Sequence, residues 1–439
     1  MLTRRLAIAV LAVWIACRLV CAADANPAFQ NAKQTFFREM KKKSAADRSE
    51  AVTAFAEIAQ KETAELILKR LFSDPDPQVR LAAQKGLAKL SEDDEVRQFL
   101  VDEFKKLQRK QGAEDTFAQL LRALAATEDE ALQTDLIKSL DEYLRSPKGN
   151  ILLPMTLIDD LGQQGDVKAV QAIKLLSRAR PFEAKFGYRR CVVQAVSNFR
   201  QPEAIDFLIA LLPQSQGQLQ YDIVQQLTKA TKQKFRDEDK AWRAWWQDNR
   251  ATFQFPKPGD PVVAFEDNVL QYYGIPICAK RVVFVLDTSG SMRGEPMEAA
   301  KRALTQTLEK LPDVVQFDVV MFDRTVSAWQ KELVSATRDA KSAATRAVLD
   351  RGMDRGTASN AALNAAFQLD PEAIYFLSDG EPTDGRPDQI ISAITTLNRT
   401  RRVSIHTIGV VTDRTGGAGL ALFMKPLADQ NYGSFQLVK

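Results

Sequence analysis

The sequence is poor in the residues that most often build metal and catalytic centres. It contains one histidine, and two of its four cysteines lie within the first 22 residues. A single histidine excludes the common zinc sites and the two-histidine metal motifs. The chain also lacks a glycine-rich phosphate loop ending in Gly-Lys, a His-Glu-x-x-His motif, a Cys-His pair and a Gly-x-Ser-x-Gly nucleophile turn. We therefore predict that the protein is not an enzyme.

The few candidates for thiol or imidazole chemistry have structural interpretations. Cys191 and Cys278 could form one disulfide bond in an oxidising compartment, but sequence alone does not show that they meet. We expect two buried free thiols instead. His406 lies in an alternating apolar run, so we expect a strand residue rather than a ligand.

A strong excess of charge is also missing. The formal net charge is +4, and removal of the first 22 residues, which contain Arg4, Arg5 and Arg18 and no acidic residue, leaves +1. A nearly neutral chain gives no reason to expect nucleic acid or an acidic membrane as a partner. Its 45% hydrophobic and 26% charged residues are typical of a globular protein, and 439 residues predict two or three domains.

The longest apolar run is short. Leu6–Ala16 has eleven residues, whereas a helix that spans a bilayer needs about 20. The run follows two arginines and precedes the small-residue pattern Val20-Cys21-Ala22, so residues 1–22 are predicted to be a signal peptide. We expect an exported protein (periplasmic, cell-surface or secreted) with no membrane span after cleavage. An uncleaved N-terminal membrane anchor is the alternative.

Residues 26–250 have the apolar period of helices. Apolar residues recur at spacings of three and four, and breakers such as Asp74-Pro75-Asp76-Pro77 separate the runs every 12 to 20 residues. Short amphipathic helices in succession can bury their apolar faces by stacking in pairs, which favours an α-solenoid. An irregular helical bundle is the alternative.

One segment of this region has a more specific pattern. Residues 74–90 resemble a HEAT repeat: Asp76 can cap a helix whose first residue is Pro77, and Val79 and Ala82 would face the neighbouring helix. The resemblance implies that Arg80 pairs with an aspartate of an adjacent repeat.

The end of the helical region is marked by tryptophans. Trp242, Trp245 and Trp246 share one helix face, which predicts a helix that closes the apolar core, although an exposed binding platform would show the same spacing. Proline- and glycine-rich turn chemistry follows, so residues 251–280 are predicted to be a linker.

From residue 281 the pattern changes to strands that alternate with helices. Val282–Leu286 is a continuous apolar run, typical of a strand buried on both faces, and similar strand patterns are predicted at Phe317–Phe322, Ala373–Leu377 and Val403–Val410. Helical stretches are Pro296–Leu311, Arg338–Leu349, Ser359–Phe367, Asp388–Leu397 and Ala418–Asp429. We predict a doubly wound α/β domain over residues 281–439, whose ligand site lies beyond the carboxyl ends of the strands.

Oxygen-bearing side chains occur where that site is expected. Asp287, Ser289 and Ser291 form an Asp-x-Ser-x-Ser motif directly after the first strand; Thr357 follows a glycine, and Asp379 follows the third strand. This set resembles the metal-ion-dependent adhesion site of the von Willebrand factor type A family, and the resemblance covers about 160 residues. It implies that these five residues are metal ligands. Asp384 is interpreted as a solvated turn residue and is not included among the predicted metal ligands.

The donor set suits a hard cation. Mg²⁺ takes oxygen ligands and retains water, and two carboxylates with three hydroxyls would leave a position for exchangeable water; Mn²⁺ or Ca²⁺ could replace it. The resemblance implies that a protein partner presents Asp or Glu to this position, while a second protein partner could bind the solenoid. The predicted function is therefore cation-dependent protein binding in adhesion or assembly. The alternative is a structural scaffold in which the solenoid binds the partner and the metal only stabilises the α/β domain.

Overall fold

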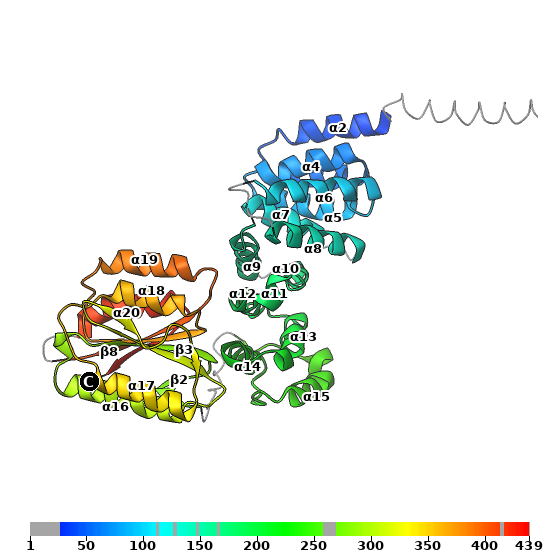
Figure 1. The fold of residues 1–439 in the computed structure, drawn as a ribbon. Helices are drawn as coiled ribbons and strands as arrows, with labels where there is room; N and C mark the ends of the chain where they lie inside the picture. The colour runs from blue at the N-terminus through cyan, green and yellow to red at the C-terminus, as the bar shows by residue number, and fades with distance from the viewer. Residues whose placement is uncertain are drawn as a thin grey trace, which may run out of the picture. The chain divides into compact units, whose positions relative to one another are not determined.

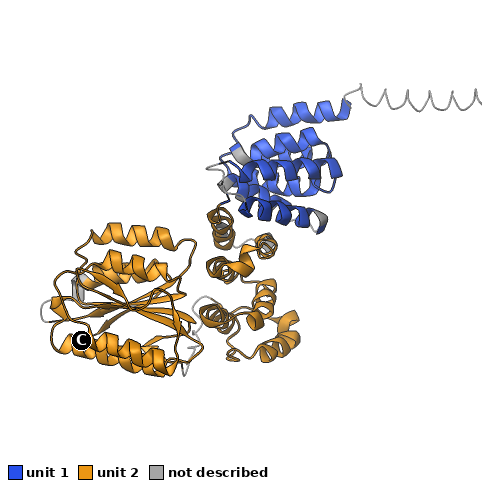
Figure 2. Cartoon of the chain, viewed as in Figure 1, with its two compact units in different colours: residues 1–149 blue, residues 150–439 orange. Residues whose placement is uncertain are grey.

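The computed structural model describes residues 27–110, 114–125, 130–145, 149–164, 167–257, 269–412 and 417–438. The predicted signal peptide lies outside these ranges, so export stays a prediction. Within them, no helix combines the length and apolarity that crossing a membrane requires. The chain divides into two compact units, Met1–Gly149 and Asn150–Lys439 (Figure 2).

The first unit is built from helices that bury apolar faces against one another (Figure 1). Phe36 and Phe55, from different helices, stack with their ring centroids 4.6 Å apart. The helices are α2 (Pro27–Glu39), α3 (Ala45–Phe55), α4 (Lys61–Ser73), α5 (Pro77–Leu90), α6 (Asp94–Gln108), α7 (Glu114–Ala125) and α8 (Glu130–Arg145).

The HEAT-like segment begins its helix at the predicted residue. The Asp76 carboxylate accepts a hydrogen bond of 2.8 Å from the main-chain N–H of Gln78, and Pro77 is the first residue of α5. Val79 is fully buried. Ala82 is only half-buried, and the adjacent Ala83 takes the buried position.

The expected role of Arg80 is filled by another arginine. Arg80 donates to the main-chain carbonyls of Asp74 and Pro75. The Asp74 carboxylate is instead held by Arg48, through two hydrogen bonds of 3.0 Å. The charge pair thus joins α3 to the turn before α5, a partner choice that depends on how the helices pack.

Helices continue into the second unit. They are α9 (Leu152–Gln164), α10 (Val167–Leu176), α11 (Pro181–Ala184), α12 (Phe186–Val196), α13 (Pro202–Leu211), α14 (Gly217–Thr231) and α15 (Asp239–Asn249), with short 3-10 turns at Leu212–Gln214 and Arg250–Thr252. In α15, Trp242 and Trp246 are buried and Trp245 is half-buried. The Trp246 indole donates to the Asp206 carboxylate at 2.6 Å. Helix α15 therefore inserts its indoles into the helical core, as predicted for a closing helix.

The α/β domain has the predicted fold class. Its sheet has the order β5-β4-β3-β7-β8-β9, and all of these strands except β5 run parallel, while β5 and β6 lie antiparallel to β4. The strands are β3 (Arg281–Asp287), β4 (Gln316–Phe322), β5 (Val326–Ala328), β6 (Val334–Ser335), β7 (Ala373–Ser378), β8 (Ser404–Val410) and β9 (Phe435–Val438). The strongly apolar strands are thus central, because both of their faces are covered.

Helices cover both faces of the sheet (Figure 1). One apolar core lies under α16 (Glu295–Lys310) and α17 (Arg338–Asp350). The other lies under α18 (Ser359–Gln368), α19 (Pro387–Asn398) and α20 (Gly417–Asp429). Side chains of β3 alternate between them: Phe284 enters the first core and Val285 the second.

Part of the segment predicted as a linker packs on this domain. Its last residues form the antiparallel strands β1 (Gln271–Tyr272) and β2 (Ile275–Pro276). The Tyr272 ring is buried, with its centroid 5.4 Å from that of Phe284 in β3. The aromatic pair Tyr272–Tyr273, which the turn chemistry around it obscured, therefore contributes to the core.

Both remaining cysteines are free thiols, as expected, although Cys278 is half-buried and only Cys191 is buried. His406 lies in β8, which confirms its interpretation as a strand residue. Its ring stacks on Tyr375 at 4.8 Å, and burial lowers the pKa of His406 to about 4. The one histidine is therefore a neutral core side chain at physiological pH.

The last helical repeats and the α/β domain meet through buried arginines. Arg190 of α12 forms an ion pair of 2.6 Å with Asp222 and donates to the main-chain carbonyl of Arg402, just before β8. Arg402 reaches back to the Asp159 carboxylate in α9. These contacts lie at the amino ends of the strands.

Asp318 is a buried ionisable side chain whose charge should make the stability of the domain depend on pH. It lies fully buried in β4, where one carboxylate oxygen accepts the Gln330 N–H at 3.0 Å and the other has no partner. Burial raises the pKa of Asp318 to about 7. The unfolded chain ionises this group near pH 4, so stability falls as the pH rises from about 4 to 7.

We predict that Asp318→Asn stabilises the protein above pH 7 and has little effect at about pH 3, where the carboxyl is mostly neutral in both states. The shift from 3.8 to about 7 sets an upper limit of about 4 kcal/mol. Urea denaturation at both pH values measures the difference, with Asp350→Asn as an exposed control in the same domain. An equal effect of Asp318→Asn at both pH values would contradict the prediction.

Candidate metal centre

Two parallel strands, β3 and β7, deliver four of the five predicted ligands to one edge of the sheet. In the register of the sheet, Asp287 at the end of β3 lies beside Phe322 at the end of β4, and Leu286 lies beside Leu377 of β7. Asp379 follows β7 directly. The carboxyl ends of β3, β4 and β7 therefore carry their loops to the same place, as the doubly wound fold requires.

Four of the five predicted residues are linked there by hydrogen-bond contacts. The hydroxyl oxygens of Ser289 and Ser291 are 2.9 Å apart, and Ser291 donates to the Asp379 carboxylate at 2.8 Å. Asp287 accepts the Ser289 N–H at 2.8 Å. Thr357 belongs to a separate loop, and its hydroxyl lies 3.9 Å from where a Cβ on Gly380, the neighbour of Asp379, would be.

The site concentrates negative charge in a buried place. Burial raises the pKa of Asp287 to about 7, against hydrogen bonds from Ser378 and Ser289 that lower it, and the Asp379 charge raises it further. Burial likewise raises the pKa of Asp379. Among the described residues, no ion pair reaches either carboxylate, and the second oxygen of Asp379 is buried without a hydrogen-bond partner.

This arrangement fits a small divalent cation. A buried carboxylate oxygen without a donor is costly in the absence of a positive charge. In the described part of the chain, this edge included, no three His, Cys, Asp or Glu side chains gather as a ligand set. A cation at this edge would therefore depend on hydroxyl oxygens as well as on two carboxylates, which is a donor set that Mg²⁺ accepts.

Comparison with known families bears on both halves of the chain. The family model for the von Willebrand factor type A domain matches residues 280–431, and the model for HEAT repeats matches residues 35–114. The chain carries a von Willebrand factor type A domain behind helical repeats. This confirms the resemblance and the fold class derived from the sequence.

Individual curated relatives match part of the chain. Inter-alpha-trypsin inhibitor heavy chain H1 of Homo sapiens is 34% identical over 123 residues, which are 25% of this chain and 14% of that protein. Heavy chain H2 of Mesocricetus auratus is 31% identical over 173 residues, which are 36% of this chain and 18% of that protein. The chain thus spans less than a fifth of the length of these curated relatives.

Solved structures give weaker similarities. A von Willebrand factor type A structure from Catenulispora acidiphila has 21% sequence identity and a TM-score of 0.33, covering 37% of this chain and 40% of that one. An aerotolerance-related membrane protein from Bacteroides fragilis has 17% sequence identity and a TM-score of 0.28, and the match covers 36% of this chain and 90% of that one.

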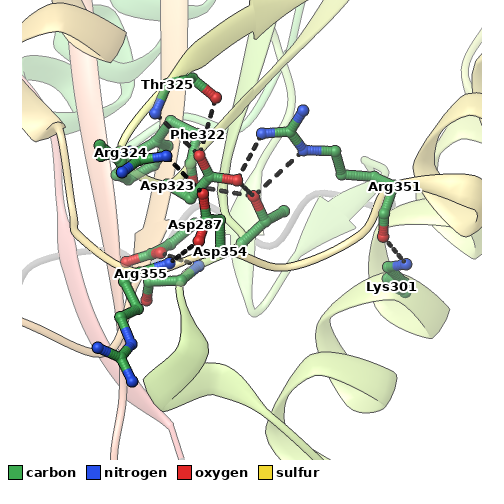
Figure 3. A network of polar contacts seen from close by, with 11 residues as sticks. Asp287, Lys301, Phe322, Asp323, Arg324, Thr325, Arg351, Asp354 and Arg355 are labelled. Atoms are coloured by element: carbon green, nitrogen blue, oxygen red, sulfur yellow. Dashed lines mark hydrogen bonds and ion pairs between the residues drawn. The ribbon is translucent and has the colours of Figure 1, made fainter.

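The type A domain also contains a polar network that sequence reasoning missed (Figure 3). Arg351 forms an ion pair of 2.6 Å with Asp323, which directly follows β4, whereas Asp287 is the last residue of β3. Burial acts to raise the pKa of Asp323, but hydrogen bonds from Thr325 and the Arg351 charge hold that pKa below its usual value. An aspartate directly after the second buried strand was the signal that could have found it.

Asp384 has a structural role in this domain. Its exposed carboxylate accepts hydrogen bonds from the main-chain N–H groups of Asn360 and Ala361, at 3.2 and 2.9 Å. These groups lie in the first turn of α18, where donors lack partners within the helix. Asp384 therefore caps a helix that starts two residues after Thr357.

We predict that Asp384→Ala lowers the free energy of unfolding by about 1 kcal/mol, as expected for a lost helix cap. Chemical denaturation measures the loss, and Glu381→Ala, an exposed change in the same loop, is the control. The same loss in both variants would show that the cap has no special contribution.

Proposed function

We propose that the type A domain is a cation-dependent protein-binding module. The observation that carries this proposal is the meeting of two buried carboxylates and two serine hydroxyls at one edge of the sheet, near the loop of Thr357, with an Asp379 oxygen left without a donor. The proposed ligands are Asp287, Ser289, Ser291, Thr357 and Asp379.

Each residue type has a distinct contribution. Asp287 and Asp379 supply two negative charges, and the serine and threonine hydroxyls supply neutral oxygens. The ligands would therefore balance the charge of a divalent cation without exceeding it. When bound, the cation offers a coordination position to a carboxylate oxygen of a protein partner. The exposed guanidinium groups of Arg293 and Arg355 lie on the loops that carry these ligands and favour an acidic partner.

Binding rather than catalysis suits the groups around this centre. His406 is a buried side chain in β8, and Cys191 lies in α12. A divalent cation held by hydroxyls and carboxylates, with no histidine or thiol beside it, has no evident general base for hydrolysis. We propose that the protein is exported and works outside the cytoplasm, on the strength of residues 1–22.

We predict that Mg²⁺ raises the melting temperature of the protein, because a cation that binds only the folded state stabilises that state by mass action. The gain is about 2.7 kcal/mol at a free cation concentration 100-fold above Kd. Thermal denaturation over a Mg²⁺ series measures it, with Mn²⁺ and Ca²⁺ as parallel series.

Two variants make that titration specific to the site. Ser289→Ala and Asp287→Asn should lose most of the cation-dependent shift, whereas Ser327→Ala, an exposed serine of β5, should retain it. Because Asn removes a buried charge at constant size, Asp287→Asn should melt no lower than the unaltered protein in EDTA. A full shift in both site variants would refute the metal centre.

We further predict that the partner contributes a carboxylate. Panning a random peptide library against the full chain in Mg²⁺ should enrich peptides with an Asp or Glu whose change to Asn or Gln abolishes binding. EDTA and Asp287→Asn should remove the enrichment. Peptides that bind equally in EDTA would favour the alternative, a scaffold whose helical repeats recognise the partner while the cation only stabilises the fold.

A further inference from the structure

Asp323 and Arg351 form an ion pair in the polar network of Figure 3, which also includes the proposed ligand Asp287. We propose that this ion pair determines the size selectivity of the centre, by fixing the loop that carries Ser289 and Ser291 relative to the loop that carries Thr357. The inference rests on the proposed metal centre and assigns the two residues as positioning residues, since neither is a ligand.

Asp323 contacts both ligand loops. Its side-chain oxygen accepts a hydrogen bond of 3.3 Å from the hydroxyl of Thr288, which lies between the ligands Asp287 and Ser289. Its main-chain carbonyl accepts the N–H of Ala358, next to Thr357, at 2.8 Å. One residue thus joins two loops that are 70 positions apart in the chain.

Arg351 completes the connection. It donates to Asp323 at 2.6 Å and to the Thr288 hydroxyl at 3.4 Å, and it belongs to the segment between α17 and α18 that leads to Thr357. Its own main-chain carbonyl is held by Lys301 of α16 at 2.8 Å. The guanidinium is therefore anchored to a helix on one side and to the serine loop on the other.

Burial distinguishes this pair from a second link between the same loops. Ser289 forms a bridge with Asp354, whose carboxylate pairs with Arg324 at 3.2 Å. The side chains of Arg324 and Asp354 are 75% and 53% exposed, whereas those of Arg351 and Asp323 are 22% and 4% exposed. Water screens the exposed pair, so the buried pair restrains the loops more strongly.

A rigid connection between ligand loops affects small and large cations differently. Mg²⁺ requires near-octahedral ligands at about 2.0–2.1 Å, while Ca²⁺ accepts about 2.3–2.6 Å in flexible geometry. Loops held at a fixed separation preserve the short distances. If the connection between the loops is removed, the short distances that Mg²⁺ needs are lost, but the longer distances that Ca²⁺ accepts are still available.

The test is the ratio of dissociation constants for Mg²⁺ and Ca²⁺, measured by calorimetry on the full chain well below its melting temperature. Arg351→Met removes the charge and the donors at similar length, and Asp323→Asn removes the pair at constant shape. Arg281→Met is the matched control, because Arg281 pairs with Asp370 at 2.9 Å at the opposite end of β3.

We expect the ratio Kd(Mg²⁺)/Kd(Ca²⁺) to rise about tenfold in Arg351→Met and Asp323→Asn, as for other residues that orient metal ligands. Arg281→Met should leave it unchanged. A general loss of stability would weaken the binding of both cations equally and leave the ratio of their dissociation constants unchanged. A constant ratio in both site variants overturns this inference alone, whereas failure of the unaltered protein to bind either cation overturns the proposed centre and this inference together.

Discussion

The parallel alignment of β3, β4 and β7 is the constraint on which the rest depends. Because these strands run in the same direction and in fixed register, residues after Asp287, Phe322 and Ser378 must emerge at one edge of the sheet. The strands are apolar enough to be covered on both faces, so the residues that end them are buried as well. The fold therefore places carboxylates where water cannot solvate them.

The buried carboxylates at the carboxyl ends of the strands differ in their hydrogen-bond and charge partners. Asp323 is satisfied within the chain, because Arg351 supplies the opposite charge and Thr325 supplies donors. Asp287 and Asp379 receive only neutral donors, and both have raised pKa values because burial disfavours their charge. Asp318 is also buried without a charged partner among the described residues, but it lies alone in the core, whereas Asp287 and Asp379 lie together beside serine hydroxyls, which suits the proposed cation.

The regular elements of the type A domain could be predicted from local pattern, since buried parallel strands and amphipathic helices leave continuous and periodic apolar signals. The predicted run Phe317–Phe322 and the observed β4, Gln316–Phe322, differ by one residue. Pairings between distant residues could not be predicted, because they depend on packing. Asp74 pairs with Arg48 rather than Arg80, and Asp323 with Arg351. The hairpin around Tyr272 was hidden by turn residues that also suit a linker.

The contacts of the last helical repeats with the type A domain lie at the opposite edge of the sheet from the proposed centre. Arg190 bonds to the carbonyl of Arg402 before β8, and the Glu372 carboxylate before β7 accepts the N–H groups of Gln218 and Lys280. These residues precede their strands, whereas Asp287 ends β3 and Asp379 follows β7. Since a parallel strand separates its two ends by about 3.3 Å per residue, a partner could reach the carboxyl edge without breaking the buried arginine contacts. The repeats can therefore hold the domain while the edge that carries the proposed centre stays available.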